Sequence, residues 1–199
     1  ADGGADDACE LSANVAVAQS FVQATDDEKD NKLWNILGEL AEGSRVIVFA
    51  NTKRRVENLA RTFGEFGTCS VHGDKQQRER EAALADFVAN KRPLMVATDV
   101  AARGLDIKLV THVINYDMAR DVESNVHRIG RTGRAGRKGV ATTFVTGEGL
   151  EENVLWDLAQ MLKKCGQPVP NDLARHPACC DPEQREFRKK HPKVVEAKK

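Results

Sequence analysis

The stretch VIVFANTKRRVENLARTF (residues 46–63) contains the pattern from which the fold can be predicted. Its first five residues, 46–50, form an unbroken apolar and partly β-branched run, which is typical of a strand buried on both faces. Thr52 can cap the helix that follows. Apolar side chains then recur with the spacing i, i+3, i+4, i+7 at Val56, Leu59, Ala60 and Phe63. That spacing indicates a helix with one apolar face, so the stretch predicts a strand followed directly by a helix.

Similar units lie on both sides of this stretch. Further strands are expected near residues 20–22, in the run ending at Val71, and at residues 94–97, 111–115 and 140–145. Helices are expected through residues 33–40, from Asp74 to about residue 90, and over about residues 149–165. Asp74 and Gln77 have the spacing of a capping box. The repeated units predict an α/β domain with a mostly parallel sheet, helices on both faces and right-handed crossovers.

Charge is distributed unevenly along a chain whose net charge is zero. The 199 residues include 30 Lys and Arg and 30 Asp and Glu, but residues 1–30 carry eight acids and one base. Residues 185–199 carry seven bases and two acids. We expect residues 1–13 to be a flexible acidic linker or the boundary of an excised fragment. The domain itself should cover about residues 14–168, and residues 169–199 should form a polar, basic tail.

Composition also limits the classes of protein to consider. No apolar run approaches the length of a membrane-spanning helix, and no segment resembles a signal peptide. The five cysteines form no CxxC pair, and their odd number argues against a disulfide framework. Too few ligands are suitably spaced for zinc. We therefore expect an intracellular protein with no metal of its own and no membrane contact, and leave cytoplasm and nucleus both open.

Polar residues follow three of the predicted strands. They form the segments 51–53, 72–74 and 98–99. Ligands of open parallel sheets bind at the carboxyl ends of the strands, so these segments should line one binding edge. In the segment after residue 97, Thr98 could donate to a phosphate oxygen, Gly104 allows close backbone approach, and Asp106 could accept from a ribose hydroxyl. An alternative with similar weight is a capped turn, with Asp99 bound to local amides and Arg103 in a surface ion pair.

Two further polar residues lie in the first turns of the helix after residue 74. Gln77 and Arg80 share a helical face, because they are three residues apart. Arg80 could bind a phosphate there, although a solvated helical face explains the pattern as well.

HRIGRTGRAGRKG (residues 127–139) places an arginine and a glycine at every third position. Four glycines without proline cannot sustain a collagen helix. A disordered, RNA-binding Arg-Gly tract is a second interpretation, and an ordered anion site is a third. In the ordered site Arg131 and Arg134 converge on one phosphate, as an arginine finger does. The chain contains no GxxxxGK[ST] loop and no acidic cluster placed to hold Mg²⁺. These arginines therefore predict half of a nucleotide site.

Four segments in this order resemble the C-terminal RecA-like lobe of the DEAD-box RNA helicases. They are VIVFANT (46–52), HGDKQQRER (72–80), VATDVAARGLD (96–106) and HRIGRTGRAGR (127–137), and the resemblance covers about residues 15–170. It implies that Arg131 and Arg134 are arginine fingers for ATP, with Arg134 nearest the γ-phosphate. It implies catalytic and lobe-coupling roles for His127, a ribose contact for Asp106 and a lobe–lobe contact for Arg103. Residues implied to bind or orient the RNA backbone are Thr52, Gly73, Gln77, Arg80, Thr98 and Gly104.

The resemblance also implies a partner for the site. ATP and Mg²⁺ would be bound mainly by an N-terminal RecA-like lobe of the same chain, and this lobe alone would be an inactive monomer. RNA, single-stranded or as a short duplex, would be bound with little sequence preference and clear salt sensitivity. The main alternative is a stand-alone RNA-binding module that never meets ATP. A nucleotide-binding regulatory domain is a weaker one, because it leaves the arginine segment without a role.

Overall fold

A computed structural model describes residues 17–102, 107, 109–134, 136–147 and 151–179 of the chain. Six strands form one sheet in the order β1-β6-β5-β2-β4-β3, and every neighbouring pair is parallel. The strands are β1 (Val17–Gln23), β2 (Val46–Phe49), β3 (Thr68–Val71), β4 (Leu94–Ala97), β5 (His112–Asn115) and β6 (Gly139–Val145). The predicted α/β fold with a parallel sheet is confirmed.

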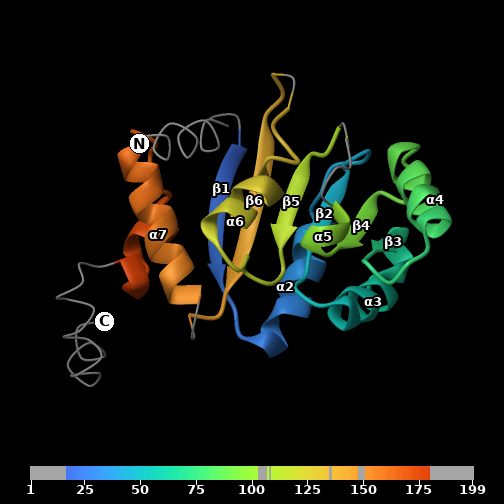
Figure 1. The fold of residues 1–199 in the computed structure, drawn as a ribbon, viewed down its shortest axis with the longest axis horizontal. Coiled ribbons are helices and arrows are strands. Elements are labelled where there is room, and N and C mark those ends of the chain that lie inside the picture. The colour runs from blue at the N-terminus through green and yellow to red at the C-terminus, as the bar shows by residue number, and fades with distance from the viewer. Residues whose placement is uncertain (1–16, 103–106, 108, 135, 148–150, 180–199) are drawn as a thin grey trace, which may run out of the picture.

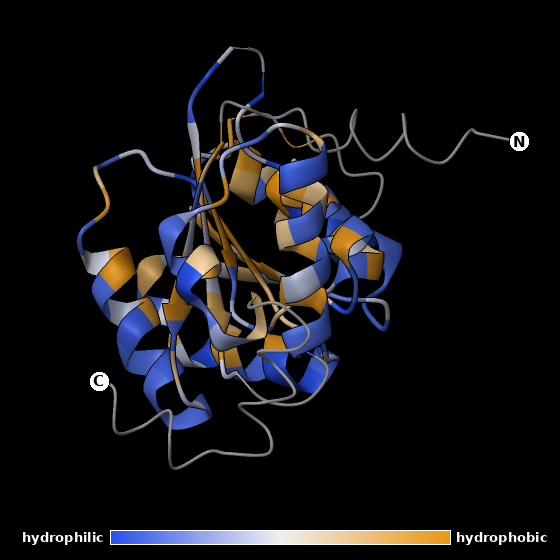
Figure 2. Cartoon of the chain, turned by 90° about the vertical axis from the view of Figure 1, so that its left-hand side faces the viewer, coloured by the Kyte–Doolittle hydropathy of each residue, from blue (hydrophilic) through white to orange (hydrophobic). Residues whose placement is uncertain are grey.

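Helices cover both faces of the sheet because successive strand residues point to opposite sides. In β2, Ile47 and Phe49 face a cluster that includes side chains of α4 (Gln77–Val88), α5 (Asp99–Ala102) and α6 (Val122–Ile129). Val46 and Val48 face a second cluster with α2 (Asp26–Gly38) and α3 (Lys53–Thr62). Figure 1 shows these layers, and Figure 2 shows the apolar sides of the helices turned toward the sheet.

The packed core extends beyond the expected end of the domain at residue 168. After α7 (Glu151–Lys164) the chain forms α8 (Asn171–Arg175) and the short 3-10 helix η2 (Pro177–Cys179). Leu173 and Ala178 are almost fully buried against Phe21 of β1 and Leu155 of α7. Two prolines and the surrounding polar residues concealed this short apolar contact from a periodicity argument. The prediction of a polar tail from residue 169 is therefore wrong for the segment up to Cys179, which packs on the domain. The expected linker at residues 1–13 and the rest of the tail, residues 180–199, lie outside the described residues.

Helix starts follow local capping chemistry, with one correction. Thr52 caps α3 as predicted, because its Oγ1 accepts from the backbone N–H of Arg55 at 3.2 Å. The cap of α4 is Gln76 and not Asp74, and the backbone N–H of Gln76 donates to Oε2 of Glu79 at 2.9 Å. The Asp74 carboxylate instead forms an ion pair with Lys53.

At Gly139 the start of β6 lies very close to Thr132 and Gly133 of the arginine-glycine segment. A Cβ at this position would lie 2.3 Å from Oγ1 of Thr132 and 2.6 Å from the backbone nitrogen of Gly133. Thr132 cannot yield easily, because it is fully buried and its hydroxyl donates to the backbone oxygen of Val110 at 2.7 Å. Only glycine therefore fits the first position of β6.

We expect Gly139→Ala to lower the free energy of unfolding by about 1–3 kcal/mol, the usual range for overpacking in a core. Urea unfolding followed by circular dichroism would measure the change. Gly38→Ala is the matched control, because no atom lies within 4 Å of the added Cβ at the end of α2. That control should be neutral or slightly stabilising. Equal stability of the two variants would contradict the packing argument.

Candidate functional site

Three polar segments meet at the carboxyl edge of the sheet, as the parallel topology requires. Phe49 at the end of β2 and Val71 at the end of β3 both pair with Ala97 of β4. The backbone N–H of Thr98 donates to the carbonyl of Val71 at 3.2 Å. The predicted residues Thr52, Gly73 and Thr98 therefore lie on neighbouring loops of one edge. We call this edge, formed by residues 51–53, 72–75 and 98–99, the strand-end rim.

Gln77 and Arg80 lie beside the rim on α4. Nη2 of Arg80 donates to the carbonyl of Ala101 in α5 at 3.3 Å, and Nη1 approaches Oε1 of Gln77 at 3.5 Å. Gln77 in turn donates to Glu81 at 2.8 Å. The contact with Ala101 ties the first turn of α4 to the segment that follows Thr98. The structure thus brings together Thr52, Gly73, Gln77, Arg80 and Thr98.

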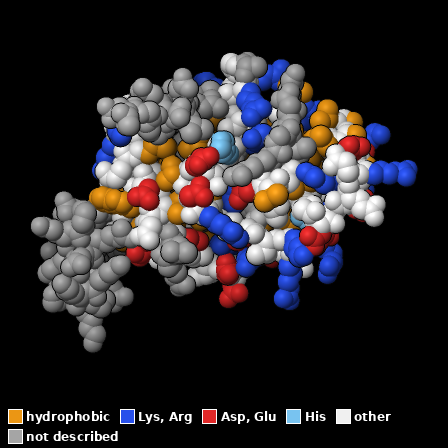
Figure 3. Space-filling model, in the orientation of Figure 1, with side chains coloured by type: hydrophobic (Ala, Val, Ile, Leu, Met, Phe, Trp, Pro, Cys, Tyr) orange, Lys and Arg blue, Asp and Glu red, His pale blue; other side chains and the backbone are white. Residues whose placement is uncertain are grey.

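Charged groups of both signs line the rim. Figure 3 shows Lys and Arg side chains along the lower edge of the molecule, with Asp and Glu side chains among them. The hydrogen bond and charge of Lys53 hold the pKa of Asp74 below its usual value. Burial would raise the pKa of Glu57, but hydrogen bonds from Ser70 and His72 and the charge of Lys75 lower it. Both carboxylates therefore stay ionised near neutral pH. Asp74 pairs with Lys53 and Glu57 pairs with Lys75, so these two lysines are partly neutralised.

The arginine-glycine segment is ordered in its described residues, unlike the Arg-Gly tract considered from sequence. Residues 127–129 end α6, and Thr132 forms a bridge with Val110. The hydroxyl of Thr132 donates to carbonyls of both Val110 and Thr111. Gly133 has a φ of 68°, a left-handed conformation that glycine adopts without strain. A buried threonine and permissive glycines therefore hold the turn in one place.

Arg131 and Arg134 both fold back onto the preceding turn. Nε of Arg131 donates to the carbonyl of His127 at 3.2 Å, and Nε of Arg134 donates to the carbonyl of Gly130 at 2.7 Å. Arg131 is partly buried and Arg134 is exposed. In both contacts Nε donates to the carbonyl four residues earlier, so both guanidinium groups are held against the backbone of the preceding turn.

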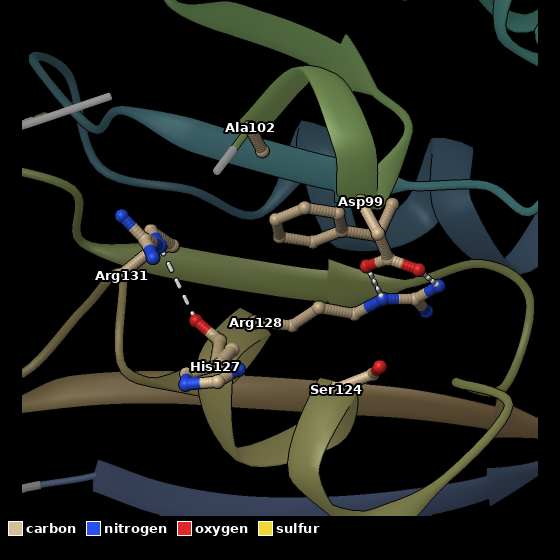
Figure 4. A pocket seen from close by; sticks show the side chains of 7 residues that line it. Asp99, Ala102, Ser124, His127, Arg128 and Arg131 are labelled. Atoms are coloured by element: carbon tan, nitrogen blue, oxygen red, sulfur yellow. Dashed lines mark hydrogen bonds and ion pairs between the residues drawn. The ribbon is translucent and has the colours of Figure 1, made fainter. Parts of the chain in front are cut away.

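His127 and Arg131 line a small pocket with Phe49, Asp99, Ala102, Ser124 and Arg128. Figure 4 shows these side chains between α5 and α6. The space open to water is about 10 Å³, enough for about one water molecule. Nδ1 of His127 is buried and meets no hydrogen-bond partner among the described residues. The pocket therefore places an unsatisfied imidazole nitrogen beside the first of the two arginines.

Arg128 has a structural role that the sequence analysis missed. The side chain is 1% exposed, and each of its five N–H donors faces an acceptor. Nε and Nη2 donate to the two carboxylate oxygens of Asp99 at 2.5 and 2.7 Å. The other acceptors are Oδ1 of Asn51 at 2.7 Å, the carbonyl of Asp117 at 2.7 Å and Oδ1 of Asn115 at 3.4 Å.

The direction of the Arg128 side chain follows from helix geometry. Helical side chains lean toward the N-terminus of their helix, and α6 follows β5, which ends at the same edge of the sheet as β2. The guanidinium therefore returns to the rim and stacks 5.2 Å from the ring centre of Phe49. A sequence signal was present, because Arg128 lies three residues after the buried Asn125 and beside the buried Ile129. The three-residue arginine period concealed it by suggesting four equivalent side chains.

Three predicted site residues, Arg103, Gly104 and Asp106, lie outside the described residues. Within the described ranges, no three His, Cys, Asp or Glu side chains are grouped so that they could hold a metal ion. None of the described helices is both long and apolar enough to cross a membrane.

Comparisons with known proteins agree on one family. Residues 28–136 match the family described as the helicase conserved C-terminal domain. The chain is 48% identical over 166 residues to DEAD-box ATP-dependent RNA helicase 40 of Oryza sativa subsp. japonica, covering 83% of this chain and 21% of that protein. The chain thus spans about a fifth of that relative's length.

Solved structures show the same likeness. The RNA helicase Prp28 from Chaetomium thermophilum bound to ADP superposes with a TM-score of 0.73 at 38% identity, covering 81% of this chain and 40% of that one. The C-terminal domain of the DEAD-box protein Dbp5 gives 0.65 at 31% identity, covering 88% of this chain and 98% of that one.

Proposed function

Because this chain belongs to the helicase conserved C-terminal domain family and is related throughout its core to DEAD-box ATP-dependent RNA helicases, we propose that it is the C-terminal RecA-like lobe of such an enzyme. In this proposal the lobe binds the RNA sugar-phosphate backbone and completes an ATP site on an N-terminal lobe of the same chain. The observation that supports it is the separation of two polar surfaces: the strand-end rim, and residues 130–134 after α6, which we call the arginine turn.

Three residues of the rim, Thr52, Gly73 and Thr98, are the proposed RNA contacts, whereas the side chains of Asn51 and Asp99 bind Arg128. Thr52, Gly73 and Thr98 lie on adjacent loops, and Arg80 is tied to the same edge. Hydroxyls, backbone amides and an arginine suit phosphate and sugar oxygens, whereas base readout needs aromatic stacking or base-edge donors. Gly104 is proposed to join this surface from the segment outside the described residues. We therefore expect little sequence preference, and a preference for RNA where ribose hydroxyls are contacted.

The arginine turn is the proposed nucleotide surface. Arg131 and Arg134 provide cations that suit the phosphates of ATP, with Arg134 nearest the γ-phosphate, and His127 contributes beside them. Mg²⁺ and most of the ATP contacts are assigned to the N-terminal lobe, because the chain contains no phosphate-binding GxxxxGK[ST] loop. ATP supplies a phosphoryl group for transfer to water, and the two arginines stabilise the charge that develops on it. Asp106 would contact the ribose, and Arg103 and His127 would contact the other lobe.

Closure of the two lobes would link the two surfaces. RNA at the rim and ATP between the lobes both favour the closed arrangement, so each ligand raises the affinity for the other. Closure brings Arg131 and Arg134 to the phosphates, while the RNA held across both lobes is bent and local duplex separates. Phosphate release then reopens the cleft. The isolated lobe should neither hydrolyse ATP at a useful rate nor unwind RNA.

The RNA half of the proposal is tested with Arg80→Gln in the full-length helicase. Loss of one phosphate contact should weaken binding of single-stranded RNA. The slope of log K against log salt should become shallower by about 0.7, the value for one phosphate on a single strand. Fluorescence anisotropy at several salt concentrations would measure both quantities.

Arg61→Gln is the matched control, because Arg61 is exposed on α3 near the opposite end of that helix from Thr52. Its salt slope should equal that of the wild type. An unchanged slope for Arg80→Gln would remove Arg80 from the RNA surface.

A further inference from the structure

We propose that Asn51 and Asp99 are positioning residues that transmit RNA occupancy at the rim to the arginine turn, through the buried side chain of Arg128. This inference rests on the proposed function and adds the physical connection between its two surfaces. It concerns residues that contact neither RNA nor ATP in the proposal.

The rim end of the connection consists of two loop side chains. Asn51 directly precedes Thr52, and Asp99 directly follows Thr98. The strands before them are paired, with Phe49 opposite Ala97. Beyond these paired residues, backbone hydrogen bonds join Ala50 to Ala97 and Thr98 to Val71. The side chains of Asn51 and Asp99 then both bind Arg128. A ligand that shifts Thr52 or Thr98 must therefore also shift an acceptor of Arg128.

The opposite end of the connection is the helix that leads into the arginine turn. Arg128 lies next to His127, whose carbonyl accepts from Nε of Arg131. α6 contains eight residues, so it extends over about 12 Å at 1.5 Å per residue. The loop that leads into α6 is joined to the rim, because Asn51 donates to Asp117 and to the carbonyl of Met118. Oδ1 of Asp121 then caps α6 by accepting from the N–H of Ser124 at 2.7 Å. The helix thus spans the distance between the two surfaces, and Arg128 reaches back along it.

The full set of contacts makes this connection stiff. All five donors of Arg128 are satisfied and the side chain is buried, so it cannot adapt to a moved acceptor without losing a hydrogen bond. Asn51 is fixed in turn, because its Nδ2 donates to the carbonyl of Met118 and its N–H donates to Oδ2 of Asp117, both at 2.9 Å. We therefore expect a displacement at the rim to be passed on to α6 through Arg128, whose paired contact with Asp99 is drawn in Figure 4.

Asn51→Ala is the most informative variant. It removes one acceptor of Arg128 and leaves the paired hydrogen bonds with Asp99, which hold the guanidinium in the core. Asn51 is also only partly buried, so the fold should survive the substitution. Asp99→Asn is the second variant, since it keeps the shape of the side chain but removes the charge that pairs with Arg128.

The experiment measures a coupling factor in the full-length helicase. This factor is the ratio of the dissociation constants for a labelled single-stranded RNA without nucleotide and with a non-hydrolysable ATP analogue and Mg²⁺. We expect Asn51→Ala and Asp99→Asn to reduce the factor by about fivefold or more, within the usual range of such couplings. RNA affinity without nucleotide should stay at the wild-type value. Thermodynamic reciprocity requires the same reduction in the effect of RNA on affinity for the analogue.

Asn58→Ala is the matched control, an exposed asparagine on α3 outside this network, and it should keep the wild-type factor. If Asn51→Ala weakens RNA binding equally in both nucleotide states, the residue has only a structural role and the inference is wrong. A wild-type factor near one would show instead that RNA and nucleotide are not coupled, which overturns the proposed function as well.

Discussion

Arg134→Ala in the full-length helicase is expected to lower RNA-stimulated ATP hydrolysis by about 10³-fold or more, the scale on which arginine fingers act. The side chain is exposed at the end of an ordered turn and is directed by its bond to the carbonyl of Gly130. In the proposed site, removal of its charge would leave the developing charge on the transferred phosphoryl group without one of its two cations. The fold should be unaffected, because an exposed side chain contributes little to stability. Steady-state phosphate release at saturating RNA measures the effect.

RNA affinity decides between this interpretation and the stand-alone RNA-binding module. If Arg134→Ala abolishes turnover and keeps most RNA binding, the arginine acts on a nucleotide held by another lobe. If turnover is unchanged and only RNA affinity falls, the arginine turn is a binding surface and the proposed nucleotide role is wrong. Arg137→Ala is the matched control, since Arg137 is the next exposed arginine of the same three-residue period. Its turnover should equal that of the wild type.

Arg128→Met should have the largest effect on stability. Methionine retains most of the apolar stem, but the Asp99 carboxylate loses its cation and Asn51 and Asn115 each lose a donor. Removal of one partner from a buried ion pair costs about 3–5 kcal/mol, because the other charge is left without compensation. The Asp99 side chain is 26% exposed and can regain some water, so the lower part of that range is expected. Urea unfolding of this chain would give the difference directly.

Arg137→Met provides the comparison for stability, and its free energy of unfolding should remain within about 0.5 kcal/mol of the wild type. A loss below about 1 kcal/mol for Arg128→Met would mean that the network of Arg128 contributes no more than an exposed ion pair. The two arginines are nine positions apart in one repeating pattern. A large difference between them would therefore demonstrate that the repeat itself does not define a common role.

The strands and helices could be predicted because their signals are local. The apolar residues 46–50 are all buried, four of them in β2 and Ala50 directly after it. Thr52 caps α3 by accepting from the N–H of Arg55, three residues later. Two boundaries were missed for reasons that are not local. Asp74 does not cap α4 because Lys53, at the start of α3, binds its carboxylate. The core continues to Cys179 because Leu173 and Ala178 find an apolar surface on β1 and α7.

The sequence by itself determined the family, the parallel α/β fold and the group of polar segments at one edge of the sheet. Contiguous motifs and period-two or period-3.6 patterns contain that information, because each depends only on neighbouring residues. Only the tertiary structure decided how the arginines of residues 127–139 differ. Arg128 meets Asp99 across 29 positions and Asn51 across 77, and no local pattern encodes those distances. Burial among these acceptors holds Arg128 inside the domain. Arg131 is partly buried and Arg134 is exposed beyond the end of α6, where the proposed second lobe would meet them.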